Sequence, residues 1–166
     1  GESHTGGRVH KPSRFLKFVF DIPSVMYRWG LGWMMGKRML AVTHTGRRSG
    51  MTYQTVLEVA LFDPKTEESI VASAYGTEAD WYRNIQAEPA SRVQTGRLDY
   101  TPEQRFLSPE EAMEAAAMFC RRHPWEAKLV PGVLPSIGAV IPRGSNAAPE
   151  ELLGSLPMVG FRPKQD

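Results

Sequence analysis

A single cysteine, Cys120, stands among the 166 residues, so an internal disulfide is excluded. A chain of this length buries a sizeable core without such a crosslink. Cys120 follows an apolar, helix-like stretch, and we expect an inert core thiol in the reducing cytoplasm. Residues 12–166 are expected to form one domain, preceded by a flexible terminus or expression remnant over residues 1–11.

Strong charge and long apolar runs are also missing. The formal net charge of +2 is too small for wholesale nucleic-acid binding, so no nucleic-acid partner is expected. No uninterrupted apolar run approaches the roughly 20 residues of a membrane-spanning helix. The aromatic-rich segment Pro12 to Gly36 predicts two short helices that begin at prolines. They either plug one end of the fold or lie in a membrane interface. In the second case the flanking cations would be Arg14, Lys17, Arg28, Lys37 and Arg38.

Residues that supply catalysis by themselves are sparse. The 4 histidines, at positions 4, 10, 44 and 123, lack cysteine or carboxylate partners at metal-ligand spacing, and no metal site is expected. Cys120 has no motif histidine nearby, and the chain contains neither a nucleophile elbow nor a Walker loop. If the protein is an enzyme, its reactive chemistry therefore belongs to a bound cofactor.

The most informative stretch is MLAVTHTGRRSG, Met39 to Gly50. Its apolar and β-branched residues predict a strand, which ends in a turn at Gly46. In the turn, Arg47 and Arg48 offer forked cationic donors, and Ser49 offers a hydroxyl. This pattern fits a cradle for the phosphate of a ligand. A solvated basic hairpin turn is the alternative.

Alternation and turn residues place the other elements. Further strands are predicted at residues 52–63, 69–75, 92–95, 98–106 and 158–162, in a largely antiparallel sheet of six to seven strands. In the second strand Tyr53, Thr55, Leu57, Val59 and Leu61 are expected to share one face.

Three helices are predicted after the second hairpin. The first covers residues 81–88, with Thr77 and Asp80 as candidate caps and with Trp81 packing inward. The second begins at Ser108 with a capping box and ends near residue 122. The third covers residues 150–153, and the rest of the proline-rich region from Pro131 to the final strand is expected to form loops.

Three motifs follow one another: LAVTHTGRRSG, VASAYG and DWYRNIQAEP. In this order they resemble the deazaflavin (F420)-dependent nitroreductase and quinone reductase family of actinobacterial oxidoreductases. The resemblance covers about residues 37–106. It implies an α+β fold, a split β-barrel of the FMN-binding type with N-terminal and flanking helices. The sequence departs from the family pattern at Val56, where many members have proline, and at Ala79 and Asp80.

The resemblance also implies roles for particular residues. The phosphate and acidic tail of coenzyme F420 would be held by Arg47, Arg48, Ser49 and Gly50. The ring would lie against Ser73, Ala74, Tyr75 and Gly76, with Trp81 and Asn84 shaping the pocket. Tyr75 and Ser73 are the catalytic candidates, and Tyr75 is the candidate proton donor. Three of these side chains also have a purely structural interpretation. Ser73 could be a strand residue whose hydroxyl is satisfied within the protein, Trp81 a core residue, and Asn84 a hydrogen-bonding residue at a helix end.

The predicted reaction is hydride transfer from reduced F420 to a quinone, a nitro compound or another conjugated electrophile. A lipophilic acceptor could be drawn from a membrane surface, which would make the protein cytoplasmic or peripheral to the membrane. The alternatives are an FMN-dependent oxidoreductase and a non-catalytic carrier of a lipid, flavin or haem-like ligand on the same barrel. The sequence leaves open both the acceptor and the choice between monomer and homodimer.

Overall fold

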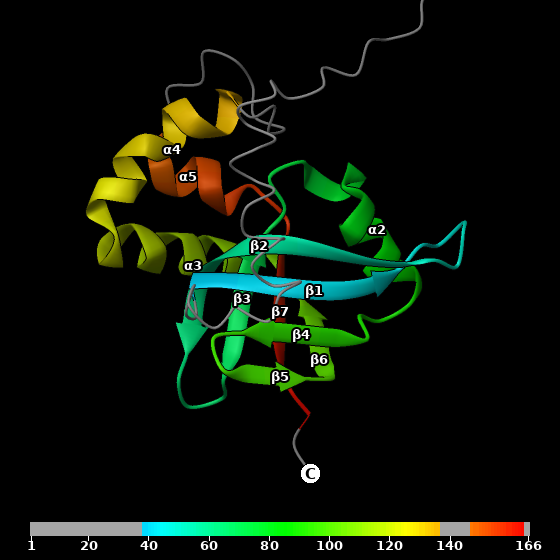
Figure 1. Ribbon diagram of the computed structural model, residues 1–166. Helices are drawn as coiled ribbons and strands as arrows, with labels where there is room; N and C mark the ends of the chain where they lie inside the picture. Colours follow the sequence, from blue (N-terminus) through cyan, green and yellow to red (C-terminus); the bar gives the residue numbers. More distant parts are fainter. Residues whose placement is uncertain (1–37, 137–146, 165–166) are drawn as a thin grey trace, which may run out of the picture.

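The computed structural model describes residues 38–136 and 147–164, and the two helices predicted before residue 37 lie outside these ranges. Seven strands form one antiparallel sheet in the order β5-β4-β1-β2-β3-β7-β6 (Figure 1). The strands are β1 (Met39–Thr45), β2 (Thr52–Asp63), β3 (Glu68–Ala72), β4 (Arg92–Thr95), β5 (Leu98–Tyr100), β6 (Pro102–Phe106) and β7 (Met158–Pro163). The helices are the 3₁₀ turn η2 (Gly76–Glu78), α2 (Asp80–Ala87), α3 (Pro109–Arg122), α4 (Pro124–Ser136) and α5 (Pro149–Gly154).

The sheet curls into a nearly closed barrel. Its two edge strands, β5 and β6, are separated in the chain by Thr101 alone, and the Tyr100 hydroxyl donates to the Phe161 carbonyl of β7 at 3.4 Å. The interior is filled by side chains from most of the strands, among them Leu40, Val42, Val71, Val93 and Phe161. Helix α2 adds Trp81 and Ile85 to the same cluster, so the predicted inward packing of Trp81 is confirmed.

A second layer covers the other side of β2, β3 and β7. Figure 1 shows α3, α4 and α5 gathered on one side of the barrel, away from α2. Their small and apolar residues, with Cys120 among them, pack against Ala60, Ile70 and Met158. Helix α3 begins with the predicted capping box, in which Glu111 N–H donates to Ser108 Oγ at 3.2 Å and Ser108 N–H donates to Glu111 Oε1 at 3.0 Å.

Two of the predicted strands differ from the observed ones. The single strand expected at residues 98–106 is divided at Thr101 into β5, which pairs with β4, and β6, which pairs with β7. Pro102, which lacks an N–H donor, begins the second of these strands. Strand β3 ends at Ala72 rather than at residue 75, because Gly76 N–H donates to the Ser73 carbonyl at 3.0 Å and closes a turn. Gly76 has φ +70°, which favours glycine.

The prediction that Leu61 shares a face of β2 with Leu57 and Val59 is wrong. The register of β2 on β3 shifts between Val59 and Leu61, as in a β-bulge. Leu57 and Val59 belong to the barrel interior as expected. Beyond the shift, Phe62 takes the interior side while Leu61 packs against the outer helices.

Two helix predictions also need correction. Loops were expected from Pro131 onward, whereas α4 continues to residue 136. Ala127 and Val130 pack α4 against the outer cluster, so tertiary contacts outweigh the poor helix propensity of its prolines. The residue that precedes α2 is Ala79, without a capping side chain, and neither Thr77 nor Asp80 caps it. Within residues 38–136 and 147–164, no helix has the length and apolar character needed to cross a bilayer.

Candidate functional site

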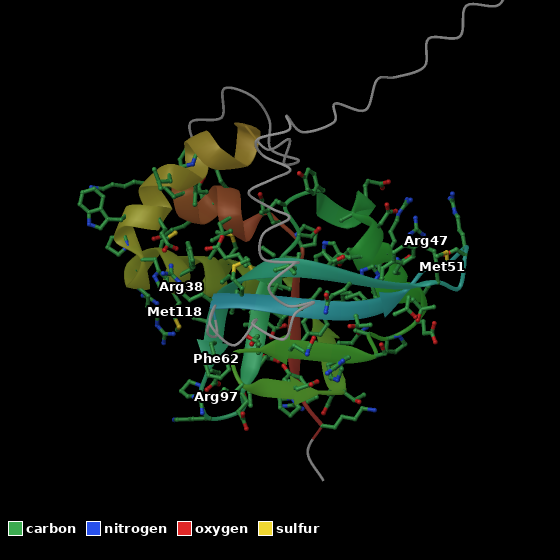
Figure 2. The ribbon with its side chains drawn as sticks, in the orientation of Figure 1. Arg38, Arg47, Met51, Phe62, Arg97 and Met118 are labelled. Atoms are coloured by element: carbon green, nitrogen blue, oxygen red, sulfur yellow. The ribbon has the colours of Figure 1, made fainter. Side chains whose placement is uncertain are left out.

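A cavity of about 700 Å³ opens between the β1–β2 turn and α2. This volume lies in the range of small-molecule and cofactor sites. The cavity brings together six of the residues that the sequence analysis named as site candidates, and these are Arg47, Arg48, Ser49, Tyr75, Trp81 and Asn84. Figure 2 shows Arg47 and Met51 at the tip of the β1–β2 hairpin.

The turn is tight because two glycines occupy it. Gly46 N–H donates to the Met51 carbonyl at 2.7 Å, and Gly50 N–H donates to the Gly46 carbonyl at 2.9 Å. Gly50 has φ +69°, a conformation that other residues rarely adopt. A Cβ atom on Gly46 would lie 2.5 Å from Ser49 Oγ and 2.8 Å from Tyr53 Cε2, so a side chain there would displace both of these groups.

Arg47 is turned toward the protein. Its backbone N–H and its Nη1 donate to Asn84 Oδ1 at 3.1 and 2.8 Å, and its Nη2 lies 3.3 Å from Asp80 Oδ1. The arginine side chain is only 22% exposed, whereas the Asp80 side chain is 86% exposed. Arg47 therefore fastens the turn to α2.

Arg48, the next residue, is exposed and makes no hydrogen bond or ion pair with any residue that the structure describes. The carboxylates at the cavity are already paired, Asp80 with Arg47 and Glu78 with Arg83 at 3.0 Å. Among residues 38–136 and 147–164, the charge of Arg48 is therefore unpaired and leaves this end of the cavity positive. Such an end suits a phosphate or another anion.

His44 lies beneath the cavity and is 3% exposed. Its Nδ1 is 3.0 Å from Asn84 Nδ2, and its Nε2 is 2.8 Å from Thr55 Oγ1. The imidazole stacks on Tyr53 with ring centroids 6.0 Å apart. Burial lowers the pKa of His44, and the charge of Asp80 partly opposes this effect.

Three further aromatic side chains form part of the cavity wall. Tyr53 and Tyr75 line the cavity and are 43% and 48% exposed. Trp81 lines it too, while its indole packs edge-on against Tyr82 at a centroid distance of 5.7 Å. Trp81 therefore belongs both to the barrel core and to the cavity, and the structural and functional interpretations of this residue are compatible.

Four predicted site residues, Gly50, Ser73, Ala74 and Gly76, do not line the cavity. The Ser73 hydroxyl is buried and donates to the Gly76 carbonyl at 2.7 Å, which is the satisfied-hydroxyl interpretation. Ala74 packs against Leu152 of α5. The expected contacts of the ring with Ser73 and Ala74, and the catalytic role of Ser73, therefore find no support in this geometry.

Eight further residues line the cavity that the sequence analysis did not assign to the site. These are His44, Gly46, Tyr53, Gln54, Thr55, Glu78, Ala79 and Asp80. His44 and Tyr53 are cross-strand partners, and Thr55 follows two residues later on the same face of β2. Strand alternation next to the arginine turn was the signal that would have found Tyr53 and Thr55.

The donor set fits a phosphorylated ring cofactor, with an uncommitted cation and the Ser49 hydroxyl at one end and aromatic walls beyond them. In the described residues, no three His, Cys, Asp or Glu side chains gather in a way that could hold a metal ion. The protein thus combines a cationic turn with an aromatic cavity on a small antiparallel barrel. This arrangement suits a protein whose reactive group belongs to a bound cofactor.

A family model described as F420H(2)-dependent quinone reductase matches residues 25–118, more than half of the chain. The chain therefore belongs to the F420H(2)-dependent quinone reductase family. It is an oxidoreductase, and its cofactor is coenzyme F420, as the resemblance of the three motifs implied. No curated protein sequence matches the chain.

Solved structures show a similar fold at low sequence identity. An F420-H2 dependent reductase, FDR-A, is 17% identical, with 76% of this chain and 96% of that chain covered and a TM-score of 0.48. A protein of unknown function from Agrobacterium tumefaciens is 16% identical, with 80% and 51% covered and a TM-score of 0.50. An FMN-binding, pyridoxamine phosphate oxidase-related protein from Nostoc punctiforme is 14% identical, with 92% and 81% covered and a TM-score of 0.48. The predicted α+β split β-barrel is confirmed by the seven-stranded antiparallel barrel and its flanking helices.

Proposed function

We propose that the cavity beside the arginine turn binds coenzyme F420, and that the protein passes a hydride from the reduced coenzyme to a quinone, a nitro compound or another conjugated electrophile. The observation that carries this proposal is the cavity itself, about 700 Å³ in volume and lined by both Arg48 and aromatic side chains. The bound coenzyme supplies the hydride-carrying ring. The residues of the chain bind it, orient it and exclude water.

Arg48 and Ser49 would hold the phosphate. Arg48 has no competing partner among the described residues, so its guanidinium can form a charge-assisted hydrogen bond worth about 1.5–3 kcal/mol. The Ser49 hydroxyl accepts from Met51 N–H at 3.2 Å, which leaves its hydrogen for Tyr53 or for a ligand oxygen. Arg47 would support the phosphate site indirectly, because Asn84 and Asp80 already occupy its side chain.

The ring would lie among Tyr53, Tyr75 and Trp81. The two tyrosines are half exposed without a ligand, so covering their faces would stabilise the complex through burial of apolar surface. The Tyr75 hydroxyl makes no hydrogen bond within the described part of the chain. This hydroxyl can therefore exchange protons with solvent and supply one to the reduced acceptor, and we assign Tyr75 as the candidate proton donor.

A lipophilic quinone is the acceptor that fits the surroundings best. Met51, at the tip of the turn and two residues before Tyr53, presents an apolar side chain that is 61% exposed. Earlier in the chain, the cations that flank the aromatic segment Pro12 to Gly36 favour reversible contact with anionic membrane lipids. A cytoplasmic protein that visits the membrane surface could collect such an acceptor there.

The direct test follows the absorbance of reduced F420 after addition of a short-chain quinone, and separately of a nitroaromatic compound. We expect quinone-dependent oxidation of the coenzyme, and tighter binding of the coenzyme to the unmodified protein than to Arg48→Ala. A titration that detects no coenzyme binding, or binding that is equal in Arg48→Ala, would contradict the placement of the site. Oxidation of the coenzyme with the nitro compound alone would contradict the preference for quinones.

A further inference from the structure

The hydrogen bonds beneath the cavity have a defined direction. Asn84 Oδ1 accepts two N–H groups of Arg47, at 3.1 and 2.8 Å. Exchanging the oxygen and nitrogen of this amide would place its NH₂ group against two donors, so the amide orientation is fixed. The Asn84 NH₂ group therefore faces His44 Nδ1, at 3.0 Å, and it can only donate. Nδ1 of His44 must be the acceptor and carries no proton.

The tautomer of His44 follows. A neutral imidazole without a proton on Nδ1 carries it on Nε2. Nε2 is 2.8 Å from Thr55 Oγ1, so this N–H donates to the threonine hydroxyl. A second proton on Nδ1 would point at the Asn84 NH₂ group, and the surrounding core disfavours a charge. His44 is thus held neutral with its only proton directed at Thr55.

The hydrogen bonds that run from Arg47 through Asn84 and His44 end at the hydroxyl of Thr55. Its oxygen accepts from His44, so its own O–H must point elsewhere. Within residues 38–136 and 147–164 this hydroxyl has no other hydrogen-bond partner, and Thr55 lines the cavity. The half-buried hydroxyl therefore presents a donor to whatever occupies the cavity.

We propose that Thr55 donates a hydrogen bond to a carbonyl oxygen of the molecule bound in the cavity, and that His44 is the positioning residue that directs this donor. The inference rests on the proposed function, because it takes the same cavity as the ligand site. The deazaflavin ring and a quinone both carry carbonyl oxygens, so the chemistry fits either one. His44 does not transfer a proton to Thr55. Its Nε2 carries the only N–H proton of the ring, and Nδ1 has no proton to replace it.

The first experiment reads the tautomer without a ligand. In ¹⁵N-labelled protein at neutral pH we expect the His44 imidazole to show an unprotonated Nδ1 and a protonated Nε2. The matched variant is Asn84→Asp, which places a carboxylate oxygen against Nδ1. In that variant we expect a proton on Nδ1. A proton on Nδ1 of the unmodified protein, or an unchanged ring in Asn84→Asp, would overturn the positioning role of His44.

The second experiment reads the donor. Thr55→Val removes the hydroxyl and keeps the shape of the side chain, while Thr55→Ser keeps the hydroxyl. We expect Thr55→Val to weaken binding of oxidised F420 about ten-fold if the coenzyme is the acceptor of this hydrogen bond. If the quinone is the acceptor, kcat/KM for the quinone falls by a similar factor at unchanged coenzyme affinity. Thr55→Ser should resemble the unmodified protein in both measurements.

A double variant links the two residues. His44→Phe retains a ring to stack on Tyr53 and removes both nitrogens. In this background we expect Thr55→Val to have little further effect, because the donor is no longer directed. Should His44→Phe fold poorly, Thr55→Val is combined with Asn84→Asp instead, with the same expectation.

Arg48→Ala, measured alongside, separates two kinds of failure. Thr55→Val without effect on either ligand, beside a weakened Arg48→Ala, overturns this inference and leaves the proposed function standing. If neither variant changes coenzyme affinity or quinone kinetics, both proposals fail.

Discussion

The backbone N–H and the guanidinium of Arg47 both donate to Asn84 Oδ1, at 3.1 and 2.8 Å. This contact ties the β1–β2 turn to a helix that follows 37 residues later in the chain. Asn84 is 4% exposed, so its amide depends on Arg47 for these bonds. The two adjacent arginines consequently differ, because Arg47 is part of the scaffold and Arg48 is left for a ligand.

The first prediction separates the two arginines. Arg48→Ala should weaken coenzyme binding about ten- to a hundred-fold with little change in melting temperature, since it loses only a phosphate contact. Arg47→Ala should lower the free energy of unfolding by roughly 1–3 kcal/mol, because the buried Asn84 oxygen loses its guanidinium donor. Coenzyme titration at moderate salt and thermal melting check both. Equal behaviour of the two variants would contradict the distinction.

The second prediction concerns the glycine at the start of the turn. Gly46→Ala should weaken coenzyme binding, because the new Cβ would lie 2.5 Å from Ser49 Oγ and 2.8 Å from Tyr53 Cε2 and would displace these two side chains of the site. Gly132→Ala is the matched control, since in the described part of the chain no atom beyond its own helix turn lies within 4 Å of its Cβ position in α4. The control should bind normally and gain up to about 1 kcal/mol of stability. Normal binding by Gly46→Ala would show that the coenzyme does not depend on the positions of these two side chains.

A third prediction tests the proton donor. If the Tyr75 hydroxyl supplies the proton, Tyr75→Phe should lower kcat by more than it lowers coenzyme affinity, because the aromatic face is retained. Tyr53→Phe is the control, since the Tyr53 hydroxyl lies 3.3 Å from Ser49 Oγ, on the phosphate side of the cavity. That variant should change affinity rather than rate. An unaltered kcat in Tyr75→Phe would remove the donor role and leave the coenzyme site intact.

A fourth prediction concerns stability in acid. The pKa of Glu111 is lowered, first by the hydrogen bond from the Ser108 backbone and then by Arg105. A carboxyl group with a lowered pKa in the folded protein contributes stability above its ordinary value of 4.5, and that contribution is lost as the pH falls through the folded pKa. Chemical unfolding between pH 7 and pH 3 should therefore show a smaller loss of stability in Glu111→Gln. An identical pH dependence would exclude this contribution.

The fifth prediction concerns the segment before the barrel. Deleting residues 1–36 should reduce binding to anionic vesicles if the cations around Pro12 to Gly36 flank an interfacial face. If the segment plugs the barrel instead, the shortened protein should be poorly soluble and partly unfolded. A folded product with unchanged vesicle binding would contradict both alternatives. Vesicle sedimentation and circular dichroism are the measurements.

Local features of the fold could be predicted from the sequence. Apolar and β-branched residues before Gly46 predicted the bounds of β1, and alternation and turn residues predicted those of β2 and β4. The Ser108 capping box predicted the start of α3. All of these signals lie within a few residues. The bulge in β2 and the length of α4 could not be predicted in this way. Both depend on packing against elements far away in the chain, which outweighs local propensity.

In the candidate site, too, local sequence motifs predicted some residues, whereas roles that depend on distant contacts were not predicted. The motifs named the arginine turn, Tyr75, Trp81 and Asn84, which the structure brings to one cavity. They did not distinguish Arg47 from Arg48, because the distinction arises from a contact with a distant helix. His44 was noticed only as a histidine without metal partners. Its role depends on Asn84 and Thr55, which lie 40 residues and 11 residues away in the chain.

The position of β7 in the sheet bears on how the chain folds as it is synthesised. β7 lies between β3 and β6, although it is the last strand of the barrel to be translated. Until it leaves the ribosome, β3 and β6 each expose a row of unpaired backbone groups, and the cavity-forming residues stand on an open sheet. Nascent chains stalled before residue 158 should therefore be captured by chaperones and cleaved readily by proteases, whereas chains released beyond residue 163 should resist both.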